Sequence, residues 1–267
     1  MKHNYIKFNV LKMHYVTAGK GPLLLILHGF PESWEVWKPQ MHELSKHYTL
    51  IIPDLVGFNL SDKPKSHKNY TLEAIMQRLV HHITQHGKRA HIVGHDLGGI
   101  LAWHLAMHHN SYVNKLLILN APHPYLLTKG MMNKGLMHRG LYTLINVPII
   151  SNILGPKIFP KVLKDILGNQ QALYSIFAKS LSYGKNTKPL EIYRSVFRRW
   201  ANNWDLRPIK KSVLILWGKH DEHLSTKLAT PPKKWVPNAK VKLLEAGHWM
   251  QYEIPHKLTK EIMLFLN

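Results

Sequence analysis

The chain has 267 residues, 45% of them hydrophobic, which is enough for one catalytic-size domain with a substantial buried core. It contains no cysteine, so disulfides, thiolate nucleophiles and cysteine-ligated metal sites are excluded. Lysine and arginine outnumber aspartate and glutamate by 36 to 15, which gives a net charge of +21. The basic residues are scattered and form no nucleic-acid-binding motif, so we expect a solvated surface and no nucleic-acid partner.

The first ten residues lack the apolar run of a signal peptide. The longest apolar stretches along the chain are five or six residues, far shorter than a membrane span. We therefore expect a protein without a membrane span and with a cytoplasmic location.

Short, continuously apolar runs bounded by turn residues recur along the chain, as is typical of strands buried on both faces of a parallel sheet. After an antiparallel lead-in pair at 7–18, the predicted strands are Leu23–Leu27, 49–52, 91–93, 116–119, 213–217 and 240–244. The helical patterns between and after them are 34–46, Leu72–His86, 100–109 and the closing helix 256–266. This alternation predicts a doubly wound, mostly parallel α/β sheet.

The alternation stops between Pro122 and Pro208, where no buried strand pattern is found. Helical patterns, for example at 162–167 and 172–181, occupy this segment instead. We predict a core domain formed by residues 1–121 and 209–267, with residues 122–208 inserted as a helical cap.

The run GHDLGG at 94–99 lies between a predicted strand and a predicted helix. This is the context of a nucleophile elbow, in which glycines permit a sharp turn that exposes one side chain above the sheet. Here that side chain is the carboxylate of Asp96. The alternative is that Asp96 only caps the following helix, but the glycines on both sides favour the elbow.

Three further groups follow the carboxyl ends of predicted strands, where open α/β sheets place their ligands. Backbone N–H groups of Phe30, in HGFP, and of Leu97 are candidates for an oxyanion hole. Asp221 and His248 follow the last two strands. The order nucleophile, acid, histidine along the chain is that of the α/β-hydrolases.

Together with these motifs, the segments HGFPESW at 28–34, DLVGFNLSDKP at 54–64, NAPHP at 120–124 and GHWMQ at 247–251 resemble the epoxide hydrolase branch of the α/β-hydrolase family. The resemblance spans nearly the whole chain and is strongest in the predicted core. It implies an α/β-hydrolase fold with a helical cap.

The resemblance also implies the chemistry. Asp96, ionised near neutral pH, would attack an epoxide carbon and form an alkyl-enzyme ester. His248, oriented by Asp221, would then activate the water that hydrolyses this ester to a vicinal diol.

Epoxide hydrolases use two cap tyrosines as acids for the departing alkoxide. The segment PLEIYR at 189–194 resembles the part of the cap that carries the second, which makes Tyr193 a candidate. The segment GLYTLINVP at 140–148 resembles the first, but Leu141 stands in the expected place and Tyr142 follows it.

Phe30, Trp34, Leu97 and Trp249 are the residues expected to line the pocket, which predicts a small, apolar organic substrate. No cofactor is expected. No metal site is expected either, because His104 and His108 have ligand spacing but lack the intervening glutamate of a metalloprotease helix.

Other functions remain open. A haloalkane or haloacid dehalogenase would use the same Asp nucleophile, although Phe30 and Leu97 stand where haloalkane dehalogenases carry Asn and Trp. A non-catalytic small-ligand receptor of the same fold would bind without turnover. A basic nucleic-acid or membrane binder would show steeply salt-dependent binding.

Overall fold

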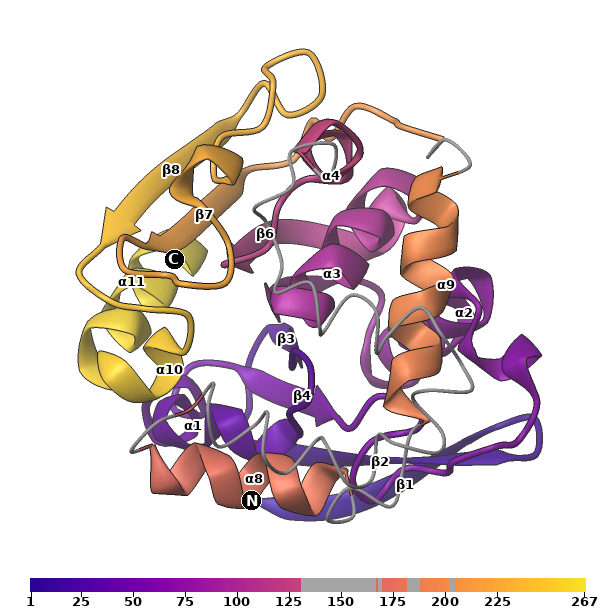
Figure 1. Ribbon diagram of the computed structural model, residues 1–267. Coiled ribbons are helices and arrows are strands. Elements are labelled where there is room, and N and C mark those ends of the chain that lie inside the picture. The colour runs from indigo at the N-terminus through magenta and orange to yellow at the C-terminus, as the bar shows by residue number, and fades with distance from the viewer. Residues whose placement is uncertain (131–166, 168–169, 182–187, 202–204) are drawn as a thin grey trace.

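The computed structural model describes residues 1–130, 167, 170–181, 188–201 and 205–267. Its centre is an eight-stranded sheet in the order β1-β2-β4-β3-β5-β6-β7-β8 (Figure 1). The strands are β1 (Lys2–Phe8), β2 (Leu11–Ala18), β3 (Leu23–Leu27), β4 (Thr49–Pro53), β5 (Ala90–His95), β6 (Val113–Leu119), β7 (Val213–Gly218) and β8 (Ala239–Leu244). The pairs β1–β2 and β2–β4 are antiparallel and the other five described pairs are parallel, so the predicted doubly wound, mostly parallel sheet is confirmed.

Helices cover both faces of this sheet. The longer ones are α1 (Lys38–Leu44), α2 (Leu72–His86), α3 (Asp96–His108), α4 (Pro124–Gly130), α8 (Gln171–Ser180), α9 (Pro189–Ala201) and α11 (Pro255–Leu266). Short helical turns are η1 (Trp34–Trp37), η2 (His67–Tyr70), η3 (Asn110–Tyr112), η4 (Thr226–Leu228) and α10 (Met250–Glu253). Helix α1 packs against α11, and α2 packs against α3. Every residue of β3 and β7 is buried, as expected for strands covered on both sides.

The structure corrects three predicted boundaries. The lead-in pair is the hairpin of β1 and β2, which begins at Lys2 and not at residue 7. The helix predicted over 34–46 is divided into η1 and α1, because Pro39 lies in the first turn of α1. The helix predicted from residue 100 begins at Asp96, so its first turn contains the glycines that the sequence reading assigned to the loop.

Between β6 and β7 the described residues form α4, α8 and α9. Helix α9, orange in Figure 1, lies beside α2, and α8 lies against η1. Tyr142 and nearly all of the predicted helical stretch 162–167 lie outside the described residues. None of the helices in the described parts of the chain is long and apolar enough to cross a membrane.

Candidate active site

The turn after β5 places Asp96 above the carboxyl edge of the sheet. Asp96 has a φ of 48°, in the left-handed region that non-glycine residues rarely adopt. A Cβ on Gly98 would lie 2.5 Å from the backbone oxygen of His28, so the close approach of α3 to the end of β3 requires glycine there. The sequence therefore builds a strained strand–turn–helix with an aspartate at its apex.

The Asp96 carboxylate receives two donors from different parts of the chain. The backbone N–H of Phe30 donates to Oδ1 over 2.9 Å. The Tyr193 hydroxyl, from α9, lies 3.1 Å from Oδ1 and 3.3 Å from Oδ2. The backbone can come this near because Gly29 has no side chain, and a Cβ there would lie 2.8 Å from the Cβ of Asp96. One backbone donor and one phenol thus converge on the predicted nucleophile.

Burial raises the pKa of Tyr193 well above its ordinary value, and the negative charge of Asp96 raises it further. The phenol therefore keeps its proton at neutral pH. It can donate that proton, or a hydrogen bond, to an oxygen that develops negative charge beside Asp96.

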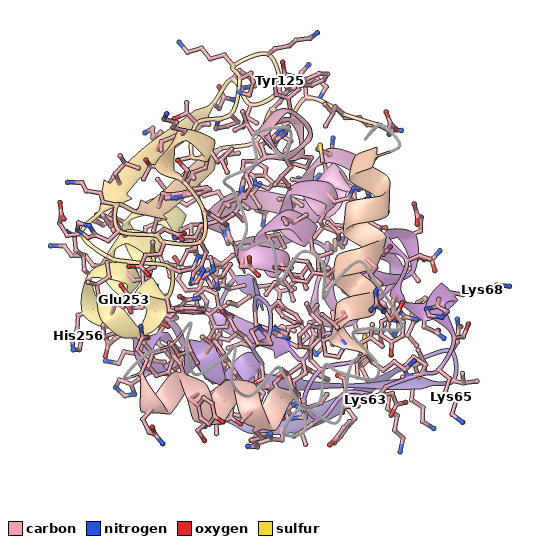
Figure 2. All side chains as sticks on the ribbon, in the orientation of Figure 1. Lys63, Lys65, Lys68, Tyr125, Glu253 and His256 are labelled. Atoms are coloured by element: carbon pink, nitrogen blue, oxygen red, sulfur yellow. The ribbon has the colours of Figure 1, made fainter. Side chains whose placement is uncertain are left out.

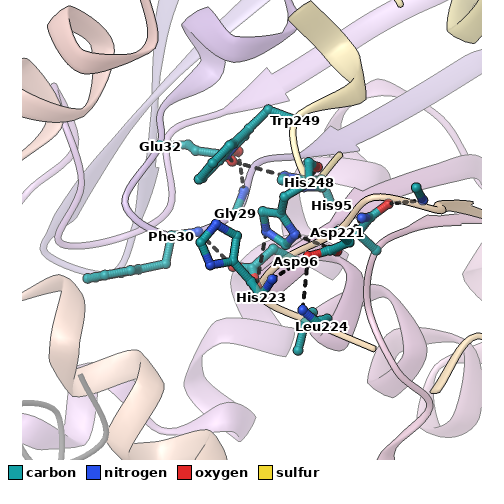
Figure 3. Close-up of polar contacts among 12 residues, drawn as sticks. Gly29, Phe30, Glu32, His95, Asp96, Asp221, His223, Leu224, His248 and Trp249 are labelled. Atoms are coloured by element: carbon teal, nitrogen blue, oxygen red, sulfur yellow. Dashed lines mark hydrogen bonds and ion pairs between the residues drawn. The ribbon is translucent and has the colours of Figure 1, made fainter. Parts of the chain in front are cut away.

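His248 lies between the two carboxylates (Figure 3). Its Nδ1 is 2.8 Å from Asp221 Oδ2, and its Nε2 is 4.0 Å from Asp96 Oδ2. The side chain of Asp221 is fully buried, and that of His248 is 6% exposed. Nδ1–H donates to Asp221, which leaves Nε2 directed toward the nucleophile.

Burial lowers the pKa of His248, but the charges of Asp221, Asp96 and Glu32 outweigh it and raise the pKa to about 9. His248 is therefore an imidazolium in the unliganded protein at neutral pH. Any event that neutralises Asp96 removes one of these three negative charges and lowers the pKa again.

Asp221 is held by four donors. Burial alone would raise its pKa, but His248, the N–H of Leu224 and the amide of Asn120 lower it to about 2. Oδ1 accepts the N–H groups of His223 and Leu224 over 2.8 and 2.9 Å. Asp221 is therefore a permanently charged partner for the imidazolium.

Sequence reasoning assigned no role to Asn120, which follows β6 with a φ of 42°. Its side-chain amide donates to Asp221 Oδ2 and to the carbonyl of Gly247, and its Oδ1 accepts the N–H of Gly218 over 3.2 Å. It thus joins the loops that carry Asp221 and His248. The sequence feature that could have indicated this role is an asparagine directly after a buried strand, at the start of NAPHP at 120–124.

A second buried polar group that sequence reasoning missed is centred on Glu32, which is fully buried. Its carboxylate accepts the N–H of Gly29 over 2.7 Å and the indole N–H of Trp249 over 2.9 Å, and it lies 2.9 Å from Nδ1 of His95. The Nε2–H of His95 donates to the carbonyl of His248. Glu32 therefore holds the backbone next to Phe30 through Gly29, and the backbone at His248 through His95 and Trp249.

The predicted pocket residues take different positions. The Phe30 ring contacts the Tyr193 ring edge to face at 4.9 Å between centroids. Trp249 contacts His248 at 5.0 Å and Phe177 at 5.6 Å.

For two other predicted residues, no described interaction supports the predicted role. Leu97 is buried in the first turn of α3, and the Trp34 ring packs against His3 and beneath Lys38. The oxyanion role of Leu97 and the pocket role of Trp34 stay predictions. His104 and His108 stack on α3 with ring centroids 4.2 Å apart, and within the described ranges no three His, Cys, Asp or Glu residues are grouped to hold a metal ion.

The sheet order, the elbow after β5 and the Asp and His after the last two strands define the class of protein. A sequence profile of the family described as alpha/beta hydrolase fold matches residues 22–143. Among solved structures, a mutant of an epoxide hydrolase from Bacillus megaterium superposes with a TM-score of 0.86 at 26% identity, covering 99% of this chain and all of that one. The predicted α/β-hydrolase fold is confirmed.

Curated relatives agree over almost the whole chain. Epoxide hydrolase 3 of Xenopus tropicalis is 31% identical over 99% of this chain and 78% of its own length. Epoxide hydrolase 4 of Homo sapiens is 30% identical over 98% of this chain and 77% of its own. The AB hydrolase superfamily protein YfhM of Bacillus subtilis is 30% identical over 100% of this chain and 98% of its own length. The chain therefore belongs to the epoxide hydrolase branch of the α/β-hydrolase family.

Proposed function

We propose that the protein hydrolyses epoxides of small, apolar organic molecules to vicinal diols through a covalent ester on Asp96. The observation that carries the proposal is a carboxylate at the elbow that faces both a protonated phenol, Tyr193, and an imidazole, His248. The names of the Xenopus tropicalis and Homo sapiens relatives agree with this chemistry. Among the described residues of the site, none favours a dehalogenase or a receptor over it.

In the first step, Oδ2 of Asp96 attacks an epoxide carbon, and the bond from that carbon to the ring oxygen breaks. The ring oxygen keeps the electron pair and takes the proton of Tyr193, whose raised pKa makes it a donor at neutral pH. Oδ1 stays on the N–H of Phe30, which therefore already holds the oxygen that becomes the ester carbonyl.

In the second step, a water attacks Cγ of Asp96 and gives a proton to Nε2 of His248. Ester formation has removed the charge of Asp96, so the pKa of His248 falls, its Nε2 proton passes to the Tyr193 phenolate, and the neutral imidazole becomes available as a base. Negative charge develops on Oδ1, where the N–H of Phe30, joined in this proposal by that of Leu97, stabilises it. On collapse the bond from Cγ to the diol oxygen breaks, and this oxygen takes the proton from Nε2 of His248 and leaves as the diol. The carboxyl group of Asp96 then gives its remaining proton to Nε2, which restores the carboxylate and the imidazolium.

We also propose that residues 122–208 form a cap over this site. The support is that α9 brings Tyr193 from this segment to Asp96, while β6 and β7 on either side of the segment are adjacent parallel strands. Tyr142 stays a candidate for the first of the two cap acids, and a cytoplasmic location also stays a prediction.

The test of the activity is diol formation from styrene oxide and a small panel of aryl and alkyl epoxides. We expect turnover of at least one epoxide and no halide release from a matching haloalkane panel. Halide release without diol would move the protein to the dehalogenases. Saturable epoxide binding without either product would make it a receptor.

Replacing Tyr193 by phenylalanine should slow ester formation by about a hundredfold or more, because general acid catalysis is lost while the ring contact with Phe30 is kept. The measurement is the single-turnover change in tryptophan fluorescence. Tyr174→Phe on α8 is the matched control and should leave the rate constant unchanged. An equal rate in Tyr193→Phe and wild type would remove Tyr193 from the proposed mechanism.

The imidazole of His248 should titrate near pH 9 in the free protein, and at lower pH in Asp96→Asn, which removes one of the three raising charges. Because the folded pKa exceeds the ordinary 6.5, the stability that His248 contributes is complete below about pH 6.5 and is lost as the pH rises through 9. Nitrogen-15 NMR of the histidine side chains measures the titration. A value at or below 6.5 in the wild type would contradict the charge arrangement.

Replacing Asn120 by leucine removes a donor to Asp221 at nearly constant volume. Hydrolysis of the ester should slow by about tenfold or more, since a hydrogen bond to a buried charged group is lost, while ester formation should change little. Rapid-mixing kinetics separate the two steps. Equal slowing of both steps would indicate general disorder of the site and contradict a specific effect on the Asp221–His248 pair.

A further inference from the structure

Exposed apolar side chains gather at the outer end of the β1–β2 hairpin. In the described part of the chain the exposed large hydrophobic residues are Met1, Tyr5, Val10, Leu60, Leu243 and Leu264. Three of the six, Tyr5, Val10 and Leu60, belong to residues 5–12 and 60–68, which we call the hairpin surface.

Val10 is the most exposed of the six, at 91%. It forms the tip of the hairpin with Asn9, between the paired residues Phe8 and Leu11. Such tips are ordinarily polar or glycine, because a turn in water gains nothing from a branched apolar side chain. Val10 therefore presents an aliphatic group to solvent and is almost uncovered by the residues that the structure describes.

Lysines surround this tip. Lys7 and Lys12 are directly opposite each other in the hairpin, and Tyr5 lies on the same face two residues before Lys7. Like charges in this position destabilise a strand pair. The hairpin surface contains five lysines, at 7, 12, 63, 65 and 68, and a single acidic residue, Asp62.

Hydrogen bonds join the two parts of the hairpin surface. The N–H of Lys12 donates to the Asp62 carboxylate over 2.8 Å, and the N–H of Asp62 donates to the carbonyl of Lys12 over 3.0 Å. The N–H of His14, which is paired with Tyr5, donates to Ser61 over 2.9 Å. Lys65 and Lys68 project outward at this end of the molecule (Figure 2). The surface is therefore continuous from the tip to η2.

Four of these lysines keep their charge unneutralised. Lys63 is half-buried, and its ammonium donates to the carbonyls of Asn59 and Ser61. Lys7, Lys12, Lys65 and Lys68 are exposed, and none is in an ion pair with any residue that the structure describes. Lysines 38, 46, 179, 219 and 242 are by contrast each paired with a glutamate.

We propose that the hairpin surface docks the protein on an anionic phospholipid bilayer. Each lysine near such a surface strengthens binding by about fivefold through attraction to the headgroups. Val10 supplies an aliphatic tip that enters the headgroup boundary, and Tyr5 has the ring-and-hydroxyl character that prefers this depth. The proposal goes beyond the enzymatic activity and does not depend on it.

The apolar tip favours a bilayer over nucleic acid. A phosphate backbone would be matched by the lysines alone, and an exposed valine at the centre of the contact would add nothing to that binding. A bilayer uses both features of the surface.

Helices α8 and α9 border the same surface, because the N–H of Asn59 donates to the carbonyl of Ser180 and His67 lies 2.6 Å from Glu191.

The test is co-sedimentation of the full chain with vesicles of phosphatidylcholine alone, or with about a third of phosphatidylglycerol, at about 0.1 M ionic strength. We expect anionic vesicles to bind at least about tenfold more tightly than neutral ones. Lys7→Glu with Lys12→Glu should reduce this binding at least about tenfold, and Val10→Asp should reduce it severalfold. Unchanged melting temperatures show that these surface variants are folded.

Helix α11 provides the matched controls, because Lys257, Lys260 and Leu264 are also exposed. Lys257→Glu with Lys260→Glu makes the same change in net charge, and Leu264→Asp makes a change like that at Val10. Both controls should bind anionic vesicles like the wild type. Equal losses in hairpin and α11 variants would mean that net charge alone attracts the protein and would overturn the proposal. Full binding by Val10→Asp, or tighter binding to a DNA duplex than to anionic vesicles, would overturn it as well.

Discussion

Replacing Asp96 by alanine is expected to lower kcat/KM for an epoxide by at least about ten-thousandfold, comparable to the loss of a catalytic triad member. In the proposed mechanism no other group can form the covalent bond. Tyr193 and the N–H of Phe30 also lose the carboxylate that they contact in the free protein. The measurement is diol formation by the purified variant beside the wild type.

Asp205→Ala is a suitable control, because Asp205 is exposed and lies 3.9 Å from His108, at the opposite end of α3 from Asp96. It should retain wild-type activity. An Asp96→Ala protein that remains folded and still forms diol within tenfold of the wild-type rate would rule out the carboxylate as the nucleophile.

Replacing His248 by glutamine is expected to separate the two steps. Ester formation does not need the imidazole as a base, whereas hydrolysis does. One equivalent of epoxide should be consumed rapidly and turnover should then stop, with steady-state activity lowered by at least about a thousandfold. Mass spectrometry of the intact protein should show an added mass equal to that of the epoxide.

His256→Gln, an exposed substitution on α11, is the matched control and should neither trap the ester nor lose activity. In the double variant Asp96→Ala with His248→Gln, the added mass should disappear. An adduct that persists in the double variant would show alkylation elsewhere, and the absence of any adduct in His248→Gln would contradict a base that acts only in hydrolysis.

The fold and the main part of the candidate site were predictable because both depend on local patterns. Continuously apolar runs marked β3, β5, β6 and β7, since strands covered on both faces leave no polar alternation. The glycines around Asp96 marked a tight turn, because a side chain at Gly98 would collide with the backbone at the end of β3. Because parallel strands bring their carboxyl ends to one edge, Asp221 and His248 were expected beside Asp96, and they lie there.

The rest could not be read from local patterns because it depends on contacts between distant segments. Glu32 belongs to the motif HGFPESW, but the residues that it contacts, Trp249 and His95, lie 217 and 63 residues away in the chain. Asn120 joins two loops that contact it from 98 to 127 residues further along the chain. The start of α3 at Asp96 was also missed, because close packing requires glycines inside a helical turn that propensity alone argues against.

The most direct measurement of the central claim is a single turnover in heavy-oxygen water, with enzyme in excess over an epoxide that it converts. In the proposed mechanism the first diol takes its new oxygen from Asp96, and the water oxygen remains in the carboxylate. We therefore predict an unlabelled diol and a label in the Asp96 peptide after digestion. Label in the diol of the first turnover, with none in Asp96, would mean that water attacks the epoxide directly and would contradict the covalent ester.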